Sequence, residues 1–455
     1  VVSYFTGSYG VYFDTTMLDN VLQTDTSEAR ELLTFGLLLH LLLYFIVPSI
    51  ALWRVKLKKT SWSKAAIRRL TYWLSGVAVL LVSTILSYQD MSSLMRNNKE
   101  LRHLITPGNY LVSMVKVLAS EAPSANTPRL SVGEDAFIEP DEGAKPKLLV
   151  IIVGETVRAA NWGLNDYQRQ TTPELANLSS VINFKQVTSC GTSTAVSLPC
   201  MFSLPGRRDY DKTYAQQHES LLDVLKRAGL NVIWVENQSG CKGVCDRVET
   251  VKITAEEYPQ LCQEGRCLDE ALVHELSSQI RQPDPRDTVI ILHQLGNHGP
   301  SYFQRYPSNF ERFIPTCKTA DLSQCSQEEI TNSYDNAILY TDHILSQIIE
   351  MLANQSNYDA SMIYLSDHGE SLGEKGLYLH GIPYAIAPDE QTHIPMLWWL
   401  SHDFSQRENI DIECLNETAE TPASHDNLFH SVLGLLNVST MIYQDELDIS
   451  QRCSS

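Results

Sequence analysis

Basic residues are scarce in this sequence. Its 455 residues include 35 lysines and arginines against 54 aspartates and glutamates, which gives a formal net charge of −19. A nucleic-acid partner needs a basic footprint for the phosphate backbone, so this balance argues against one. The sequence also shows no internal repeat, and its length is that of two or three structural units rather than one ordinary domain.

The first residues of the sequence also lack the pattern of a signal peptide. The chain begins at Val1, inside a stretch rich in Val, Tyr and Phe. It lacks the charged start and the small-residue cleavage site of a signal peptide. We therefore expect a partial sequence that has lost upstream membrane spans.

Charge is absent from two long runs, residues 32–53 and 70–89, which contain 22 and 20 residues. About 20 apolar residues cross the hydrocarbon core of a bilayer. His40 and Pro48 leave open the alternative of buried core helices. The connector 54–69 favours the membrane, because it carries seven Lys and Arg residues and no acid, as short cytoplasmic loops do. This topology places the N-terminal segment and everything after the second run on the outer side.

The ten cysteines include no CxxC pair, which argues against a zinc ribbon. Eight of them form close pairs in the C-terminal part, which the topology places in an oxidising compartment. We expect four local disulfides, namely Cys190–Cys200, Cys241–Cys245, Cys262–Cys267 and Cys317–Cys325. The sequence does not settle whether the remaining Cys414 and Cys453 pair.

Four segments are expected along the chain. They are an outer segment (1–31), a transmembrane hairpin (32–89) with the basic cytoplasmic loop 54–69, a bridging helix and linker (90–146), and a large outer domain (147–455). In the outer segment, Asn20, Thr24 and Glu28 are spaced i, i+4 and i+8, so we expect them on one helix face.

The large domain alternates short apolar runs with amphipathic ones. Residues 147–153, 231–235, 288–293 and 361–366 are apolar on both faces, as strands of a buried parallel sheet should be. Helical patterns lie between them, at 219–228, 268–279 and 328–352. The alternation predicts a three-layer α/β domain with a mostly parallel sheet. In such sheets the functional site lies at the carboxyl ends of the strands.

Acidic and imidazole side chains follow three of these predicted strands. Glu155 follows the first, His293 and His298 lie at and after the third, and Asp367 and His368 follow the fourth; His380 lies twelve residues further on. A single such residue is more often a cap or a turn former. Three strands that end this way at one sheet edge instead predict a metal site. Carboxylate and imidazole ligands without thiolate suit Zn²⁺ in an open catalytic site better than Mn²⁺.

A cluster of small and hydroxyl residues lies between Cys190 and Cys200. A disulfide-closed loop would hold its backbone N–H groups and a hydroxyl in fixed geometry for an anion. Metal coordination can activate a hydroxyl, which is otherwise a weak nucleophile. The composition gives equal standing to Thr192, Ser193, Thr194 and Ser197.

Long ordered stretches of the sequence resemble one known family. They are YFTGSYGVYFDTTMLDNVLQTDTSEA, GETVRAANWGLNDYQRQTTPEL, SCGTSTAVSLPCMFS, GCKGVCDRV, HQLGNHGPSYFQRYP and SDHGESLGEKGLYLHGIPYAIAPDEQTHIP. Together they are similar to the phosphoethanolamine transferases that modify lipid A, a group that includes the mobile colistin-resistance enzymes. The resemblance covers nearly the whole chain. It implies an alkaline-phosphatase/sulfatase-like periplasmic catalytic domain after a partial helical transmembrane domain in the bacterial inner membrane.

The resemblance also assigns roles to residues. It implies that Thr194 is the nucleophile and that zinc is bound by Glu155, Thr194, Asp367 and His368. His298 and His380, with Lys242, match positions that bind the phosphoryl group or a second metal; one zinc ion is expected, and a second stays open. The role of His293 is less clear. The family's head-group positions correspond to Asn20, Thr24 and Glu28, whereas Asn237 and Gln238 are left out of the site.

The implied reaction is a zinc-dependent ping-pong transfer. Phosphatidylethanolamine is the donor, Thr194 carries the phosphoethanolamine group, a phosphate of lipid A accepts it, and His380 or His298 moves the proton. Polymyxin and colistin resistance would follow, and a monomer is expected. One alternative is a hydrolase or sulfatase of the same fold, although the Cys/Ser-x-Pro-x-Arg sulfatase motif is missing after Cys200. Two others are a glycerol-phosphate transferase and a sensor domain with structural zinc.

Overall fold

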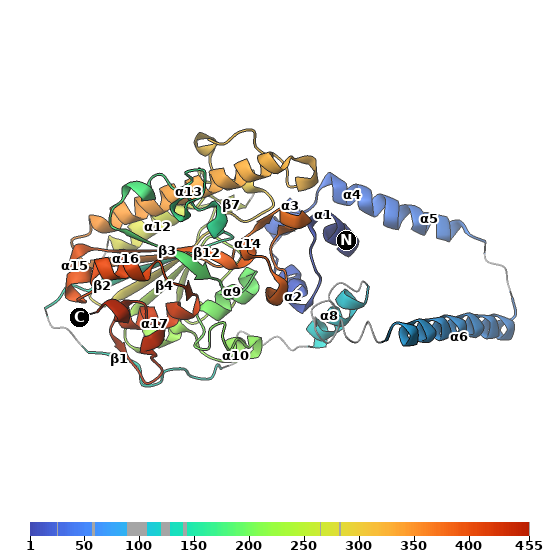
Figure 1. The fold of residues 1–455 in the computed structure, drawn as a ribbon, viewed down its shortest axis with the longest axis horizontal. Helices are drawn as coiled ribbons and strands as arrows, with labels where there is room; N and C mark the ends of the chain where they lie inside the picture. Colours follow the sequence, from blue (N-terminus) through green and yellow to red (C-terminus); the bar gives the residue numbers. More distant parts are fainter. Residues whose placement is uncertain are drawn as a thin grey trace.

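The computed structural model describes residues 1–24, 26–56, 60–88, 107–119, 128–139, 143–263, 265–281 and 284–454, except for the side chains of residues 27 and 28. Within these ranges the chain forms one α/β domain, a layer of short helices beside it, and two long helices that project away from both (Figure 1).

An eight-stranded sheet forms the centre of the domain. Its spatial order is β13 (Ala423–Ser424), β3 (Val181–Thr188), β12 (His393–Leu400), β9 (Asp359–Ser366), β2 (Lys147–Gly154), β8 (Thr288–His293), β4 (Asn231–Glu236) and β5 (Glu249–Lys252). Only β12 runs antiparallel to its neighbours among these strands. The predicted, mostly parallel sheet is therefore confirmed. The four predicted strands are β2, β4, β8 and β9, whereas the sequence pattern did not find β3 and β12.

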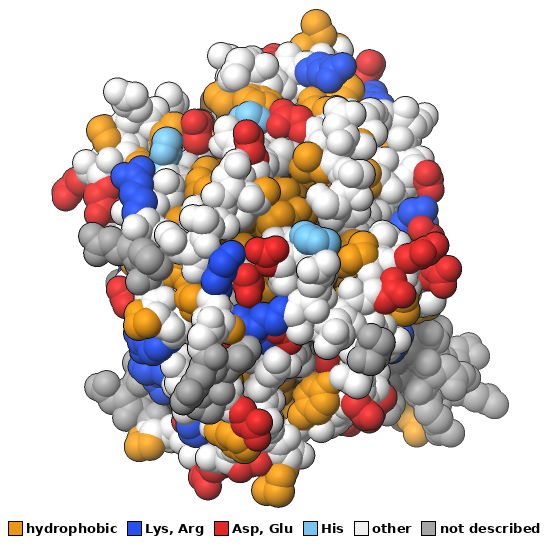
Figure 2. Space-filling model, turned by 90° about the vertical axis from the view of Figure 1, so that its left-hand side faces the viewer, with side chains coloured by type: hydrophobic (Ala, Val, Ile, Leu, Met, Phe, Trp, Pro, Cys, Tyr) orange, Lys and Arg blue, Asp and Glu red, His pale blue; other side chains and the backbone are white. Residues whose placement is uncertain are grey.

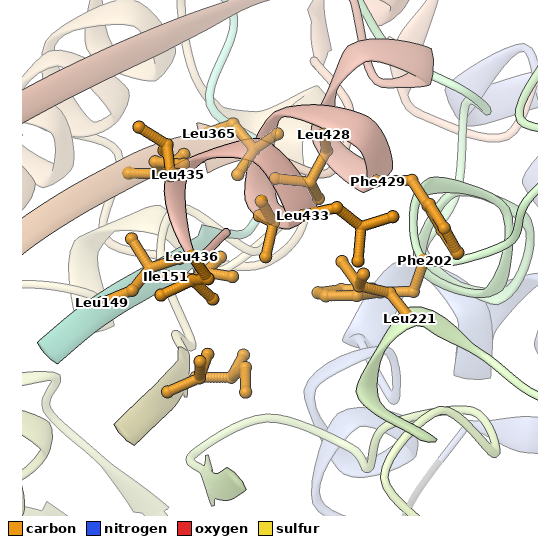
Figure 3. Packing of buried hydrophobic residues seen from close by; sticks show 14 of the residues in the cluster. Leu149, Ile151, Phe202, Leu221, Leu365, Leu428, Phe429, Leu433, Leu435 and Leu436 are labelled. Atoms are coloured by element: carbon orange, nitrogen blue, oxygen red, sulfur yellow. The ribbon is translucent and has the colours of Figure 1, made fainter. Parts of the chain in front are cut away.

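Helices cover both faces of the sheet, which makes three layers (Figure 1). Strand β2 alternates between them: Leu149 and Ile151 pack among residues of α11 (Leu221–Arg227) and α17 (Asp426–Leu435), as Figure 3 shows. Leu148 and Ile152 face the other way, into a core with α12 (Glu270–Ile280) and α13 (Gln327–Ala353). Because all eight residues of β2 are buried, its uniformly apolar sequence is explained by burial on both sides.

The remaining elements are short. The other α-helices of the domain are α9 (Thr194–Met201), α10 (Lys212–Gln217), α14 (Asp389–Thr392), α15 (His402–Arg407) and α16 (Ile412–Thr418). Three two-stranded sheets pair β1 (Phe137–Ile138) with β14 (Val438–Ser439), β6 (Cys262–Gln263) with β7 (Arg266–Cys267), and β10 (Ser371–Leu372) with β11 (Tyr378–Leu379).

Two helices are long and apolar enough to cross a membrane. The first joins α4 (Phe35–Leu41), a π-helical turn (Leu42–Ile46) and α5 (Val47–Arg54), and the second is α6 (Trp62–Leu86). Both project from the domain (Figure 1) and expose large apolar side chains such as Trp53 and Trp62. A large exposed apolar surface of this kind is typical of a segment that contacts lipid. By contrast, the far end of the domain carries interspersed acidic and basic side chains with scattered apolar ones (Figure 2).

The outer segment packs between the domain and these two helices (Figure 1). It contains α1 (Val2–Tyr9), α2 (Thr15–Gln23) and α3 (Thr26–Glu31), and α2 also contacts α8 (Gly108–Ala119). Tyr9 donates a hydrogen bond to the carbonyl oxygen of Ala320 at 3.2 Å. Residues 128–139 also pack on the domain, with Val132 and Ala136 in its core. The division of the chain at residue 147 stays a prediction.

All ten cysteines are paired. The four predicted local disulfides are confirmed, and a fifth joins Cys414 to Cys453, which the sequence left open. Five disulfides agree with an oxidising compartment for this domain.

Candidate active site

The carboxyl ends of four adjacent parallel strands meet at one edge of the sheet. In the register of β9, β2 and β8, Gly154 pairs with Ser366, and Val153 pairs with His293. The residues that follow these strands, Glu155 and Asp367, therefore lie side by side. The predicted convergence of strand-end acids and histidines is confirmed by this register.

Thr194 is the hydroxyl that lies among these side chains. It is the first residue of α9, and its Oγ1 lies 3.1 and 3.3 Å from the two carboxylate oxygens of Glu155. It also lies 3.4 Å from Nε2 of His368. Its position at the start of α9 adds backbone N–H groups that favour an anion.

The other three hydroxyls of this loop have different surroundings. Thr192 donates to the carbonyl oxygen of Ile382 at 2.7 Å, and Ser197 donates to that of Asp367. Ser193 Oγ has no hydrogen-bond partner among the described residues. The structure thus separates four hydroxyls that composition alone could not rank.

Glu155, Asp367 and His368 offer ligand atoms that all lie within 4.8 Å of one another, and all three are fully buried. One carboxylate oxygen of Asp367, Oδ1, accepts from the backbone N–H groups of Thr156 at 3.1 Å and His368 at 2.7 Å. The other, Oδ2, is buried without a hydrogen-bond partner in the described part of the chain. A buried carboxylate oxygen of this kind is costly unless a cation binds it.

The orientation of His368 also fits a metal. Its Nδ1 lies 2.9 Å from the carbonyl oxygen of Gly369, which assigns the N–H to Nδ1 and leaves the lone pair on Nε2. Nε2 lies 3.3 Å from Asp367 and 3.6 Å from Glu155. Burial, aided by the nearby His380, lowers the pKa of His368 well below its ordinary value. Burial likewise raises the pKa of Asp367. With Thr194, these residues form an oxygen and nitrogen donor set that fits zinc.

His298 and His380 lie beside this group. The ring centroid of His380 is 4.4 Å from that of His368 and 5.8 Å from that of His298. Glu370 holds the cluster, because its carboxylate accepts from His380 Nδ1 at 2.8 Å and from the Tyr302 hydroxyl at 2.6 Å. Sequence reasoning missed Glu370, although it lies two residues after His368 in the same motif.

The loop after β4 carries two further residues of interest, and one of them contacts the site. Lys242 lies in the Cys241–Cys245 disulfide loop, and its Nζ contacts the backbone oxygen and hydroxyl of Ser239 at 3.2 and 3.0 Å. Gln238 donates to Glu155 Oε2 at 3.1 Å. Leaving Gln238 out of the site was therefore wrong. Its place directly after a predicted strand was the available signal.

His293 forms a buried pair with Glu236, its partner in the β4–β8 register. His293 Nδ1 lies 3.0 Å from the Glu236 carboxylate. Burial alone would raise the pKa of Glu236, but the charge and hydrogen bond of His293 outweigh it and lower that pKa to about 2. The pair fixes the ring of a strand-end histidine at the edge of the site.

The outer-segment residues do not share one helix face, so that expectation was wrong. Helix α2 ends at Gln23, and Thr24 is extended, with φ −62° and ψ 128°. The Thr24 hydroxyl donates to the carbonyl oxygen of Asn20 at 2.9 Å, a local bond that competes with helix continuation. The side chain of Glu28 lies outside the described residues.

Helix α2 nevertheless lies against the site. It contacts α9, which begins with Thr194. A Cβ added to Gly381, the residue after His380, would lie 2.6 Å from Met17 Cε. Met17, one turn before Asn20, therefore lies next to the residue that follows His380.

Comparisons with known proteins agree with this architecture. Residues 147–438 match the Sulfatase family, and residues 1–122 match the family described as phosphoethanolamine transferase EptA/EptB. The chain is 43% identical to phosphoethanolamine transferase EptA of Escherichia coli K12, over 99% of this chain and 83% of that protein. It is 40% identical to phosphatidylethanolamine transferase Mcr-1 of Escherichia coli, over 88% and 76%.

A solved structure extends the likeness to three dimensions. The integral membrane protein EptA from Neisseria meningitidis superimposes with a TM-score of 0.94 at 42% identity, covering 100% of this chain and 85% of that one. The chain is accordingly an inner-membrane protein with a periplasmic catalytic domain, in agreement with the charge of its loop and with its disulfides. The chain belongs to the phosphoethanolamine transferase family that includes EptA and Mcr-1.

Proposed function

We propose that this chain transfers phosphoethanolamine from phosphatidylethanolamine to a phosphate of lipid A through a covalent intermediate on Thr194. The observation that carries the proposal is the position of Thr194 Oγ1, 3.1 Å from Glu155 and 3.4 Å from His368, beside the unpartnered Oδ2 of Asp367. One hydroxyl thus lies next to the buried ligand atoms of Glu155, Asp367 and His368, a group that carries no positive charge of its own.

Glu155, Thr194, Asp367 and His368 would hold one zinc ion, and His298, His380 and Lys242 would hold the phosphoryl group or a second ion. Bound zinc supplies Lewis-acid chemistry, which lowers the pKa of a hydroxyl and polarises a phosphoryl oxygen. Thr194 Oγ1 gives its proton to His380 or His298 and attacks the phosphorus, and the bond from phosphorus to the diacylglycerol oxygen breaks. His380 or His298 gives that oxygen a proton, with Glu370 holding His380 in place.

The second half of the cycle reverses the first. A phosphate oxygen of lipid A attacks the phosphorus, the bond to Thr194 Oγ1 breaks, and Thr194 regains a proton. Positioning and charge neutralisation supply most of the acceleration, because phosphoryl transfer needs little other chemistry from a protein.

The outer segment would hold the ethanolamine group. Asn20 and Thr24 would supply oxygens, and the Glu28 carboxylate would complement an ammonium. The transferred ammonium would offset negative charge on lipid A, which weakens the attraction of cationic polymyxins and yields colistin resistance. The four-segment organisation of the chain and a monomeric state belong to the same proposal.

Mass spectrometry of lipid A from cells that express the protein tests this function. We expect an added phosphoethanolamine group with the wild-type chain and with Ser193→Ala, the neighbouring hydroxyl, and no addition with Thr194→Ala. Unmodified lipid A from cells with correctly inserted wild-type protein would contradict the proposal. A glycerol-phosphate addition would favour the alternative transferase.

A further inference from the structure

A large cavity lies beside the site and takes no part in the chemistry described so far. Its volume is about 970 Å³, and its wall includes Arg30, Glu31, Arg266, Leu295, Ser301 and Tyr306. The wall therefore combines the end of α3 with the β6–β7 hairpin and the loop after β8. Pockets for small ligands occupy roughly 300–1,000 Å³, so this one is at the large end of the range.

One loop separates the cavity from the reaction centre. Leu295 and Ser301 lie three residues on either side of His298 and line the cavity. The other side of this loop packs on Glu155, because a Cβ added to Gly296 would lie 2.7 Å from the Glu155 carbonyl oxygen. Asn297 N–H also donates to that oxygen at 3.0 Å. A ligand in the cavity would thus contact the loop that carries His298.

The cavity wall carries positive charge in a chain whose net charge is −19. Arg30 and Arg266 contribute two guanidinium groups and Glu31 one carboxylate. Glu31 is shared, because its carboxylate lies 3.4 Å from Arg266 Nε and 2.5 Å from a terminal nitrogen of the buried Arg305. Two arginines against one glutamate give this wall a net positive charge, which favours an anionic ligand.

The same ion pairs connect the cavity wall to the reaction centre. Arg305 Nε donates to the carbonyl oxygen of His298 at 2.6 Å. A bridge of three residues therefore runs from Glu31, at the end of α3, to the backbone of a histidine of the site. A ligand that contacts Glu31 would therefore be linked through Arg305 to the backbone of His298.

We propose that this cavity binds the phosphorylated sugar head group of the acceptor. The inference rests on the proposed function and adds to it the place where the second substrate is held. Guanidinium groups match the planar geometry of phosphate oxygens, and glutamine and serine side chains on the wall, such as Gln263 and Ser301, suit sugar hydroxyls. Helix α3 directly precedes the first apolar helix, so the cavity lies on the side where a lipid head group would enter.

In the step that this site serves, an acceptor phosphate oxygen bonds to the phosphorus carried by Thr194. The bond between phosphorus and Thr194 Oγ1 breaks, and the electron pair leaves with the threonine oxygen, which takes up a proton. In this scheme the donor half-reaction uses neither Arg30 nor Arg266. This separation makes the two halves distinguishable by experiment.

The test measures both half-reactions on the full chain in detergent micelles, with fluorescent phosphatidylethanolamine as donor and lipid A as acceptor. The variants are Arg30→Gln, Arg266→Gln and their combination, with Arg281→Gln, an exposed arginine at the end of α12, as the matched control. We expect the KM for lipid A to rise about tenfold for each arginine removed, the equivalent of one charge-assisted hydrogen bond. The burst of diacylglycerol released without acceptor should stay at the wild-type level.

An unchanged acceptor KM in the double variant would overturn the inference, as would an equal loss in the diacylglycerol burst. Arg30 is exposed, so its variant is expected to fold, and Arg30→Lys should recover part of the acceptor affinity by restoring the charge. Failure of the proposed function has a different signature, because the wild-type protein would then release no diacylglycerol at all.

Discussion

The strand-end side of the site and the outer-segment side are held in different ways. Glu155, Asp367 and His368 are fully buried and follow strands that are packed on both faces. The outer segment buries apolar side chains such as Tyr9 and Phe13 against the domain, but its polar side chains lie nearer to water. One example is the ion pair of Asp19 with Lys212, whose side chain is 44% exposed. The reacting groups are therefore preorganised by the core, whereas the substrate-holding groups depend on contacts that water can weaken. The predictions below test this difference.

Removing the nucleophile should have the largest effect. Thr194→Ala deletes the only one of the four loop hydroxyls that contacts both Glu155 and His368, so we expect turnover to fall about 10⁴-fold or more. Transfer to lipid A by purified protein measures it. Ser193→Ala should retain most activity, and a comparable loss in that variant would contradict the assignment.

The second largest effect should be a loss of bound zinc when Asp367 is changed. Asp367→Asn removes the charge at the unpartnered oxygen and keeps the oxygen that accepts the two backbone N–H groups, so we expect zinc affinity to fall more than about 100-fold while the fold persists. Elemental analysis and thermal unfolding of one sample check both parts. Asp359→Asn, at the opposite end of the same strand, is the control and should keep its zinc.

Glu370 supports the histidine cluster without belonging to the donor set. Glu370→Gln replaces the carboxylate that accepts from His380 and Tyr302, and we expect kcat to fall about 10- to 100-fold with little change in the KM for the donor. Tyr302→Phe removes only one of these bonds and should cost less. A Glu370→Gln variant with wild-type kcat would show that His380 is held by other contacts.

Stability near the site should depend on pH through His425. Burial lowers the pKa of His425 to about 4, and its ring links the Cys190 backbone N–H to the Ser366 carbonyl oxygen. The unfolded chain binds a proton near pH 6.5 and the folded one does not, so this stability is present above pH 6.5 and is lost as the pH falls toward 4. Between pH 7 and pH 5 the loss is about 2 kcal/mol. In His425→Gln, the unfolding temperature should change less between pH 7 and pH 5 than in the wild-type protein. An equal change in both proteins would contradict this origin.

The outer segment should give the smallest effect. Asp19→Ala or Lys212→Ala breaks a partly exposed ion pair at the surface, which contributes about 0.2–1 kcal/mol. We expect the KM for phosphatidylethanolamine to rise a few-fold and kcat to stay near the wild-type value. The exchanged pair, Asp19→Lys with Lys212→Asp, should restore the KM. A loss of activity as large as that expected for Glu370→Gln would contradict the difference between the strand-end residues and the outer segment.

The same difference explains what the sequence could predict. Strands β2, β4, β8 and β9 were found because burial on both faces leaves uninterrupted apolar runs. Strand β12 was missed because Pro395 interrupts its apolar pattern. It also runs antiparallel, so it does not belong to the alternation of strands and helices that indicates a parallel sheet. The acids and histidines at strand ends could be found because parallel strands finish at one edge.

Contacts that depend on tertiary packing could not be found in this way. Gln238 and Glu370 follow predicted strands, but the side chains that they contact come from other parts of the chain, so the sequence alone did not show their roles. The helical spacing of Asn20, Thr24 and Glu28 was misleading, because α2 ends at Gln23 and Thr24 is extended. The resemblance, rather than spacing, singled out Thr194 among four equivalent hydroxyls, and the distances to Glu155 and His368 give a physical reason for that choice.

The central claim is that Thr194 carries the phosphoethanolamine group between two lipids. Mass spectrometry of the peptide that contains Thr194, after incubation of the protein with phosphatidylethanolamine and without acceptor, tests it most directly. We predict a phosphoethanolamine adduct on Thr194 that disappears when lipid A is added. An adduct on another residue, or an active protein that never carries one, would contradict the account.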